Sequence, residues 1–393
     1  MTKQTTISKA FSLSGVGIHT GKKVKLTFKP APVNHGYAFS RVDLEGTPVI
    51  KADANLVVNT TRGTNLEKNG VSIQTSEHVL AALVGLEIDN VLIELNASEP
   101  PIMDGSSIHF VEALLEAGIE EQDAERYEYV VRENITFADE ETGSEITVIP
   151  ADNYQVTTMV DFGTKVLGTQ NANLKNLADF KDQFANARTF SFLHEIESLL
   201  EHGLIKGGDL NNAIVYVDKE LSKETMSKLC KAFNRDSISV KPNGILDNLT
   251  LKYPNEAARH KLLDVIGDLA LVGCRIKGKV IANKPGHGTN TNFAKKLAKI
   301  IKKERRNRVP GCFIMFQKYN SMYNDGIFNS CIFEYALIIT IYIVFFSGTD
   351  HALYRNGTIY RGHKQQSPKS IHGGIWRWQA CLPIGTRLVV SNR

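Results

Sequence analysis

A histidine and a carboxylate in the second half of the sequence have a spacing that suits metal binding. His260 and Asp264 lie four residues apart in a segment with helical periodicity, so both side chains project from one face of the expected helix. A neutral imidazole and a carboxylate one turn apart can hold two corners of a tetrahedral zinc ion. A hydrogen-bonded pair on an exposed helix is the alternative, and it is the more common one for an isolated pair. Asp268 continues the same face and could orient another group.

A second segment offers a carboxylate and a histidine side by side at the start of a helix. Thr75 or Ser76 can cap this helix, which places Glu77 and His78 in its first turn. Adjacent helical residues point about 100° apart, so His78 could bind a metal while Glu77 faces a water beside it and takes its proton. Alternatively, Glu77 only favours the helix dipole and His78 is a polar surface residue.

Two further segments could assist attack on a carbonyl carbon. His287 is flanked by glycines after an expected strand; as a cation steadied by Asp268, it could stabilise an oxyanion or protonate a leaving amine. Thr189 could donate a hydrogen bond to the oxyanion. A simple glycine-rich turn and an ordinary strand residue are the alternatives. Together, the candidates supply the three ligands, base, cationic acid and oxyanion donor of metal-assisted amide hydrolysis. His19, between glycines, is interpreted as a turn residue near the site rather than a ligand.

The segments that carry these candidates form two halves with a weak internal repeat. Each half opens with alternating apolar residues after a Thr-Gly turn, which predicts strands. Each half later offers a helix followed by a strand, at 78–86 and 91–95 and at 260–271 and 279–282. This pattern predicts an α+β fold of two similar domains, each with helices packed on a sheet. His78 and His260 would then begin matching helices and could meet at one site between the domains.

The composition indicates an ordinary globular protein. Of 393 residues, 42% are hydrophobic and 22% are charged, which suffices for a buried core and for two or three domains. The net charge of +4 gives no argument for binding to nucleic acid or to a membrane surface. The N-terminus lacks an apolar run before a small-residue cleavage site, so we expect no signal peptide. Five cysteines without Cys-X-X-Cys spacing favour a reducing cytoplasm.

A last helix is marked before residue 310. Asn290 or Thr291 is expected to cap it, and Phe293 and Leu297 begin an apolar face that continues at positions 300 and 301. Its lysines form either a solvated face or a surface that attracts an anionic substrate.

Seven ordered segments of the chain carry a resemblance to a known family. The segments are Gly15–Gly21, Ser76–His78, Pro101–Ser107, Ala187–Phe190, Gly207–Gly208, Arg259–Asp264 with Gly267–Asp268, and Gly286–His287. Together they resemble the family of UDP-3-O-acyl-N-acetylglucosamine deacetylases, zinc enzymes of lipid A biosynthesis in Gram-negative bacteria. The resemblance covers about residues 5–305.

The resemblance implies a cytoplasmic hydrolase that uses Zn2+ to remove the acetyl group of UDP-3-O-acyl-N-acetylglucosamine, the committed step of lipid A biosynthesis. Iron is an alternative metal, because the ligands are not selective. The implied roles are as follows: the metal ligands are His78, His260 and Asp264; the base is Glu77; the general acid or charge stabiliser is His287, steadied by Asp268; the oxyanion donor is Thr189; and the substrate contacts are Lys261 and Phe190, with His19 beside them.

The resemblance also suggests boundaries. We expect a first deacetylase domain at 1–125, a second at 126–305, and a linker with an unassigned tail at 306–393. The fatty acyl chain of the substrate is expected to lie in an apolar passage within about residues 186–208. We expect a monomer that binds no nucleic acid and does not insert stably into a membrane. The alternatives are a hydrolase of the same fold for another N-acyl sugar nucleotide, a non-catalytic protein in which a metal braces two domains, and a product that its tail tethers to a membrane or makes a scaffold.

The tail departs from the pattern. Residues 311–393 hold only three acidic residues, and the apolar run at 336–346 is too short to span a bilayer. Some family members continue into a β-hydroxyacyl-carrier-protein dehydratase, but no segment after Pro310 resembles its catalytic motifs. The tail is therefore interpreted either as the aberrant, for example frame-shifted, end of a truncated fusion or as a short appended segment.

Overall fold

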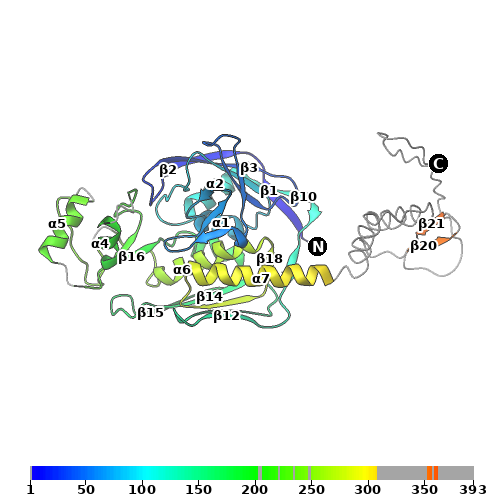
Figure 1. Cartoon of the computed structure of the whole chain (residues 1–393). Coiled ribbons are helices and arrows are strands. Elements are labelled where there is room, and N and C mark those ends of the chain that lie inside the picture. The colour runs from blue at the N-terminus through cyan, green and yellow to red at the C-terminus, as the bar shows by residue number, and fades with distance from the viewer. Residues whose placement is uncertain are drawn as a thin grey trace, which may run out of the picture. The chain divides into compact units, whose positions relative to one another are not determined.

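Two five-stranded sheets of the same topology build the N-terminal part of the computed structural model (Figure 1). The first has the order β2 (Phe11–Val16), β3 (Lys23–Pro30), β9 (Val91–Leu95), β4 (Tyr37–Arg41) and β5 (Val49–Lys51). The second has the order β12 (Ile135–Asp139), β13 (Ser144–Ile149), β19 (Lys279–Asn283), β14 (Gln155–Asp161) and β15 (Thr169–Leu174). In both sheets the central strand pairs antiparallel with the second strand and parallel with the fourth. The predicted α+β fold with a repeated arrangement is confirmed.

The structure describes residues 2–201, 206–219, 222–232, 235–246, 249–307, 352–355 and 358–361. Residues 1–303 form one compact unit, and residues 304–393 form a second. In the second unit, β20 (Ala352–Arg355) and β21 (Thr358–Arg361) make an antiparallel pair. The interpretations of the tail concern residues that lie mostly outside those described. Within the described residues, no helix combines the length and the apolar character needed to cross a membrane.

Helices α1 (Glu77–Gly85) and α6 (Glu256–Leu269) occupy equivalent places in the two halves, because each precedes the central strand of its sheet. They pack directly against each other. Every residue of α1 is buried, which explains why its apolar residues are not confined to one stripe. A Cβ atom at Gly267 would overlap the backbone oxygen of Glu77, so glycine is required where the two helices cross. This close crossing places the first turn of α1 against the last turn of α6, about one turn beyond Asp264.

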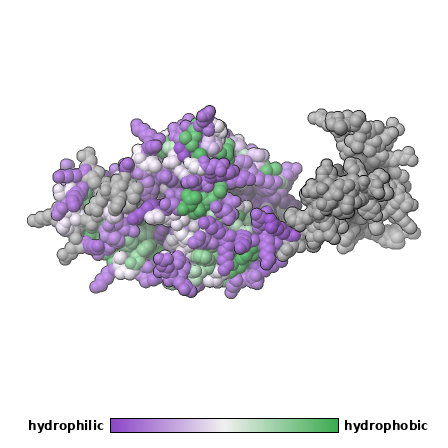
Figure 2. Space-filling view, in the orientation of Figure 1, coloured by the Kyte–Doolittle hydropathy of each residue, from purple (hydrophilic) through white to green (hydrophobic). Residues whose placement is uncertain are grey.

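One continuous hydrophobic core joins the two halves. It includes Phe28 and Phe39 from the first sheet, Val148 from the second, and Phe293 from α7 (His287–Asn307), all of them fully buried. Full burial of such a side chain stabilises the fold by about 1.5–3 kcal/mol. The surface over this core is largely hydrophilic on the face seen in Figure 2, and its hydrophobic residues there form small, separate patches.

The remaining elements connect and extend the sheets. Short strand pairs join β1 to β10, β11 to β18 and β16 to β17, while β6, β7 and β8 form a three-stranded sheet. A smaller hydrophobic cluster, which includes Leu193, Ile196 and Leu229, lies under α4 and α5. The bounds are β1 Lys3–Ile7, β6 Val57–Asn59, β7 Asn65–Lys68, β8 Val71–Ile73, α2 Ile108–Ala117, β10 Ile119–Glu125, β11 Glu128–Val130, α3 Phe180–Gln183, β16 Phe190–Phe192, α4 Leu193–Glu201, β17 Ile214–Tyr216, α5 Lys223–Ala232 and β18 Arg275–Lys277, with 3-10 turns at Ala54–Leu56, Leu177–Asp179 and Ala270–Val272.

The predicted start of the last helix is wrong. Helix α7 begins at His287, and not after Asn290 or Thr291. Asn290 donates its side-chain amide to Asp268, and the hydroxyl of Thr291 donates to the backbone oxygen of His287, as in a helix interior. Neither side chain is therefore available as a cap. Ser76 does precede α1 as predicted, but its hydroxyl donates to the backbone of Thr64 instead of capping the helix.

Candidate metal centre

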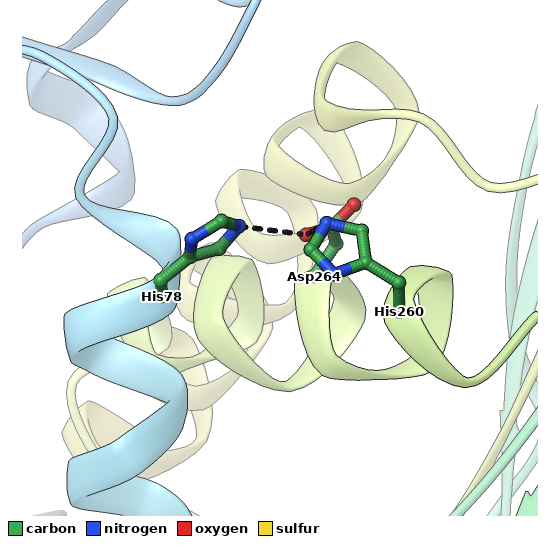
Figure 3. A group of neighbouring side chains, drawn as sticks. All are labelled: His78, His260 and Asp264. Atoms are coloured by element: carbon green, nitrogen blue, oxygen red, sulfur yellow. Dashed lines mark ion pairs between the residues drawn. The ribbon is translucent and has the colours of Figure 1, made fainter. Parts of the chain in front are cut away.

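Helices α1 and α6 bring His78, His260 and Asp264 together (Figure 3). The Nε2 atoms of the two histidines lie 3.8 and 3.4 Å from Oδ1 of Asp264, respectively. The two imidazole rings are 5.0 Å apart and nearly perpendicular. As Figure 3 shows, one imidazole comes from α1 and the other from α6, and both point toward the same carboxylate. The predicted ligand set thus converges on one point from the two halves of the chain.

The chemistry of this donor set fits a metal ion. Oδ1 of Asp264 is buried and has no hydrogen-bond partner among the described residues, which is costly for a carboxylate unless a cation or proton satisfies it. Nδ1 of His260 lies 3.0 Å from the backbone oxygen of Ala187. A proton on Nδ1 serves this bond and leaves the Nε2 lone pair free, the arrangement that orients metal-binding histidines. Two imidazole nitrogens and one carboxylate oxygen form a ligand set that zinc and other divalent transition metals accept.

The surroundings of the three residues keep them in the protonation states of ligands. Desolvation, together with the charge of His260, lowers the pKa of His78 to about 3. Desolvation likewise lowers the pKa of His260. Burial alone would raise the pKa of Asp264, but the charges of His260, Lys261 and other neighbours outweigh it and lower the pKa. At neutral pH the site therefore offers two neutral imidazoles and one carboxylate.

Glu77 lies beside these residues in the first turn of α1. Its Oε2 accepts a hydrogen bond of 2.9 Å from the backbone of Thr64, and its Oε1 lies 4.0 Å from Nε2 of His287. Desolvation raises the pKa of Glu77 to about 7, against the opposing effect of His287. A carboxylate with a pKa near the working pH is well suited to accept and release a proton.

His287 approaches the same space from the start of α7. Its Nδ1 lies 2.9 Å from Oδ2 of Asp268, and its Nε2 lies 3.9 Å from Oδ2 of Asp264. Burial would lower the pKa of His287, but Asp268 and then Glu77 raise it to about 9. Asp268 is itself held by the side chains of Asn290 and Thr64. The structure thus presents a cationic imidazole with Nε2 directed at the site.

A pocket of about 250 Å³ opens onto these groups. Thr189, Phe190, His19 and Lys261 all line it, so every residue predicted to act on substrate lies at one cavity except Asp268, which lies behind His287. Lys261 places Nζ 3.1 Å from Asp264 and 5.8 Å from the ring centre of Phe190. Further aromatic and aliphatic walls come from β16, α4 and β17. These apolar walls include Phe190, Phe192 and Ile196, which belong to the segment predicted to house an acyl chain.

The chain is similar to proteins of one known family. The sequence model of the family described as UDP-3-O-acyl N-acetylglycosamine deacetylase matches residues 4–235 and 228–299. The chain belongs to this family. A bifunctional enzyme LpxC/FabZ of Bacteroides thetaiotaomicron is 48% identical over 302 residues, which cover 77% of this chain and 66% of that protein. A protein of the same name from Chlorobaculum tepidum is 45% identical over 308 residues, which cover 78% of this chain and 66% of that protein. A UDP-3-O-acyl-N-acetylglucosamine deacetylase of Myxococcus xanthus is 38% identical over 296 residues, which cover 75% of this chain and 86% of that protein.

The deacetylase family match includes every predicted site residue, from His19 to His287. The chain spans slightly less than two thirds of the length of the two bifunctional relatives, since 66% of each is aligned. The residues that match the family therefore include the candidate metal ligands and the lining of the pocket.

One buried carboxylate near the pocket was not among the residues predicted from the sequence. Glu99 is fully buried and accepts hydrogen bonds from the backbone of His19 and Thr20 and from the hydroxyls of Thr20 and Thr75. A Cβ atom at Gly17 would overlap this carboxylate, so the glycine lets the loop close around it. Glu99 therefore links the loop of His19 to Thr75, two residues before α1. Glu99 lies two residues before one of the segments that carry the family resemblance, but nothing in its spacing distinguishes it.

The ligand set gives a testable prediction about metal content. We expect the purified full chain to bind about one zinc ion, and His78→Ala to weaken zinc binding by more than about 100-fold. Loss of a residue that only orients a ligand costs 10–100-fold, and loss of a ligand itself costs more. Metal analysis after dialysis and competition with a chelator measures this.

His109→Ala is the matched control, because the side chain of His109 is half-buried and also lies 3.8 Å from an aspartate, Asp104. Unchanged zinc binding in His78→Ala would contradict the assignment of the ligands.

Proposed function

We propose that this protein hydrolyses the acetamide of UDP-3-O-acyl-N-acetylglucosamine to UDP-3-O-acyl-glucosamine and acetate in a zinc-dependent reaction. This is the committed step of lipid A biosynthesis, and we place it in the cytoplasm of a Gram-negative bacterium, with a monomeric enzyme. The observation that carries the proposal is that two histidines and an aspartate able to hold a metal, a buried glutamate and a third histidine surround one point in a chain of the deacetylase family. The relative from Myxococcus xanthus bears the name of this activity.

The proposed metal ligands are His78, His260 and Asp264. When bound there, zinc supplies a Lewis acid that polarises a carbonyl group and lowers the pKa of a water molecule. Glu77 lies beside the ligands and takes a proton from the attacking water at its carboxylate. Its pKa of about 7 supports this role, because the group is substantially ionised at neutral pH and still holds the transferred proton.

His287 completes the reaction from the other side of the site. It holds a proton at Nε2 while Nδ1 donates to Asp268, and it gives the Nε2 proton to the amine nitrogen as the C–N bond breaks. Thr189 lines the same pocket and donates a hydrogen bond to the oxygen on which charge develops. The elements of one water molecule are divided between the products, with the hydroxyl in acetate and a hydrogen on the amine.

Substrate binding is proposed to use the pocket that opens onto the site. Phe190 and Lys261 flank the reacting groups, and His19 faces them from the first half of the chain. The apolar walls from residues 190–196 and 208–215 suit a fatty acyl chain, which loses contact with water when it enters.

The assay that tests this function compares two substrates. The zinc-loaded full chain is expected to release acetate from UDP-3-O-acyl-N-acetylglucosamine, and to turn over UDP-N-acetylglucosamine at least about 100-fold less efficiently. Burial of a long alkyl chain at about 0.8 kcal/mol per CH₂ group exceeds the roughly 2.7 kcal/mol that this factor requires.

Equal turnover of both compounds would point to a deacetylase for another N-acyl sugar nucleotide. Zinc binding without turnover of either compound would point to a structural metal site and contradict the proposal.

A further inference from the structure

Arg62 lines the pocket and has no role in the reaction described above. It lies in the segment between β6 and β7 and lines the pocket together with Thr61 and His19. Its side chain is 36% exposed, and its Nη1 lies 3.6 Å from Oε1 of Glu195 on α4. Arg62 and Glu195 thus face each other from the two halves of the chain.

The pocket is poor in cations. Among its described lining residues, Arg62 and Lys261 alone carry a permanent positive charge. Lys261 is already paired with Asp264, at 3.1 Å, and its side chain is only 17% exposed. A nucleoside diphosphate brings two charged phosphate groups, and these groups need donors or cations once they leave water. The lining offers Arg62 as the cation that is still accessible to them.

The present partner of Arg62 holds it weakly. The distance of 3.6 Å exceeds that of a hydrogen bond, and an exposed ion pair of this kind contributes little to stability. Glu195 does not depend on Arg62, because its Oε2 accepts hydrogen bonds from the hydroxyl of Ser191 and the backbone of Phe192, at 2.9 and 3.1 Å. The guanidinium can therefore exchange partners without leaving a carboxylate unsatisfied.

Arginine matches phosphate better than it matches a single carboxylate oxygen at this distance. Its planar donors can bind two phosphate oxygens in parallel, and such charge-assisted bonds are about twice as strong as neutral ones. We propose that Arg62 binds the diphosphate of the substrate and releases Glu195 when it does so. The inference rests on the proposed function and adds to it a residue that sets specificity for the anionic part of the substrate.

Binding of UDP and of uridine to the zinc-loaded full chain tests this inference without turnover. Titration calorimetry on Arg62→Met, which keeps an apolar stem, is expected to show UDP affinity reduced by about 10- to 100-fold and uridine affinity unchanged. Arg62→Lys keeps the charge but not the planar donor pair, and is expected to fall between the parent and Arg62→Met. In the deacetylase assay, KM rises in Arg62→Met while kcat stays within about twofold, because the contact is the same in the ground and transition states.

Arg235→Met is the matched control. Arg235 is 43% exposed, forms an ion pair of 3.9 Å with Asp209, and does not line the pocket. Arg235→Met removes the same charge as Arg62→Met and is expected to leave UDP affinity unchanged.

Several results would overturn the inference. They are an Arg62→Met variant that binds UDP like the parent, an equal loss of UDP and uridine affinity, an equal loss in Arg235→Met, and a parent that binds UDP no more tightly than uridine. A parent that binds UDP but does not deacetylate the substrate contradicts the proposed function and leaves the assignment of Arg62 to the diphosphate standing.

Discussion

Replacing Glu77 by glutamine is expected to lower kcat by roughly 10²- to 10⁴-fold without loss of zinc or of the fold. Glutamine has nearly the same shape and still accepts the hydrogen bond from the backbone of Thr64, so the first turn of α1 keeps its geometry. It cannot accept a proton from water, and this is the property that the reaction loses. Because burial disfavours the charged form of Glu77, its removal also relieves desolvation, and the melting temperature is not expected to fall.

The measurement is kcat and zinc content of Glu77→Gln beside Glu112→Gln, which replaces an exposed glutamate on α2. The control is expected to match the parent in both. Full activity in Glu77→Gln would show that another group acts as the base. Low activity combined with low zinc content would show that Glu77 supports the metal centre instead.

The fold could be predicted from the sequence because its two halves repeat one pattern. The alternating residues after each Thr-Gly turn became β3 and β13, and the two predicted helix–strand pairs became α1 with β9 and α6 with β19. Alternation and helical period are local signals, so they fix the type of an element without knowledge of its neighbours. The prediction of where α7 starts was wrong because Asn290 and Thr291 are residue types that often cap helices. In the structure, their side chains bond Asp268 and the backbone of His287 instead.

The site likewise has features that the sequence predicts and features that only the folded structure shows. The spacing of His260 and Asp264 on one helix face is visible in sequence, and the repeat suggested that His78 would meet them. The crossing of α1 and α6 that produces this meeting depends on Gly267, whose importance appears only when the helices are in place. Thr64 donates to both Glu77 and Asp268, and no local pattern links positions 13 and 204 residues apart. Glu99 and Arg62 were missed for the same reason, since their roles come from partners distant in sequence.

Replacing His287 by glutamine is the other change with a large expected effect, again a loss of roughly 10²- to 10⁴-fold in kcat. Glutamine can still donate to Asp268 but cannot deliver a proton to the leaving amine. The parent is expected to show a bell-shaped dependence of rate on pH. The rate rises as Glu77 ionises, near its pKa of about 7, and falls as His287 loses its proton, near its pKa of about 9.

Asp268→Asn separates the charge of His287 from its position. The asparagine can still accept a hydrogen bond from the imidazole, but it removes the anion that most strongly opposes the effect of burial on the pKa of His287. That pKa must therefore fall, and the alkaline limb of the profile moves to lower pH, while the acid limb set by Glu77 moves less. The positive charge of a bound zinc ion moves both limbs of the profile to lower pH. The quantity to compare is therefore the difference between Asp268→Asn and the parent, both loaded with zinc. An alkaline limb that stays in place in Asp268→Asn and persists in His287→Gln would assign it to a group other than His287.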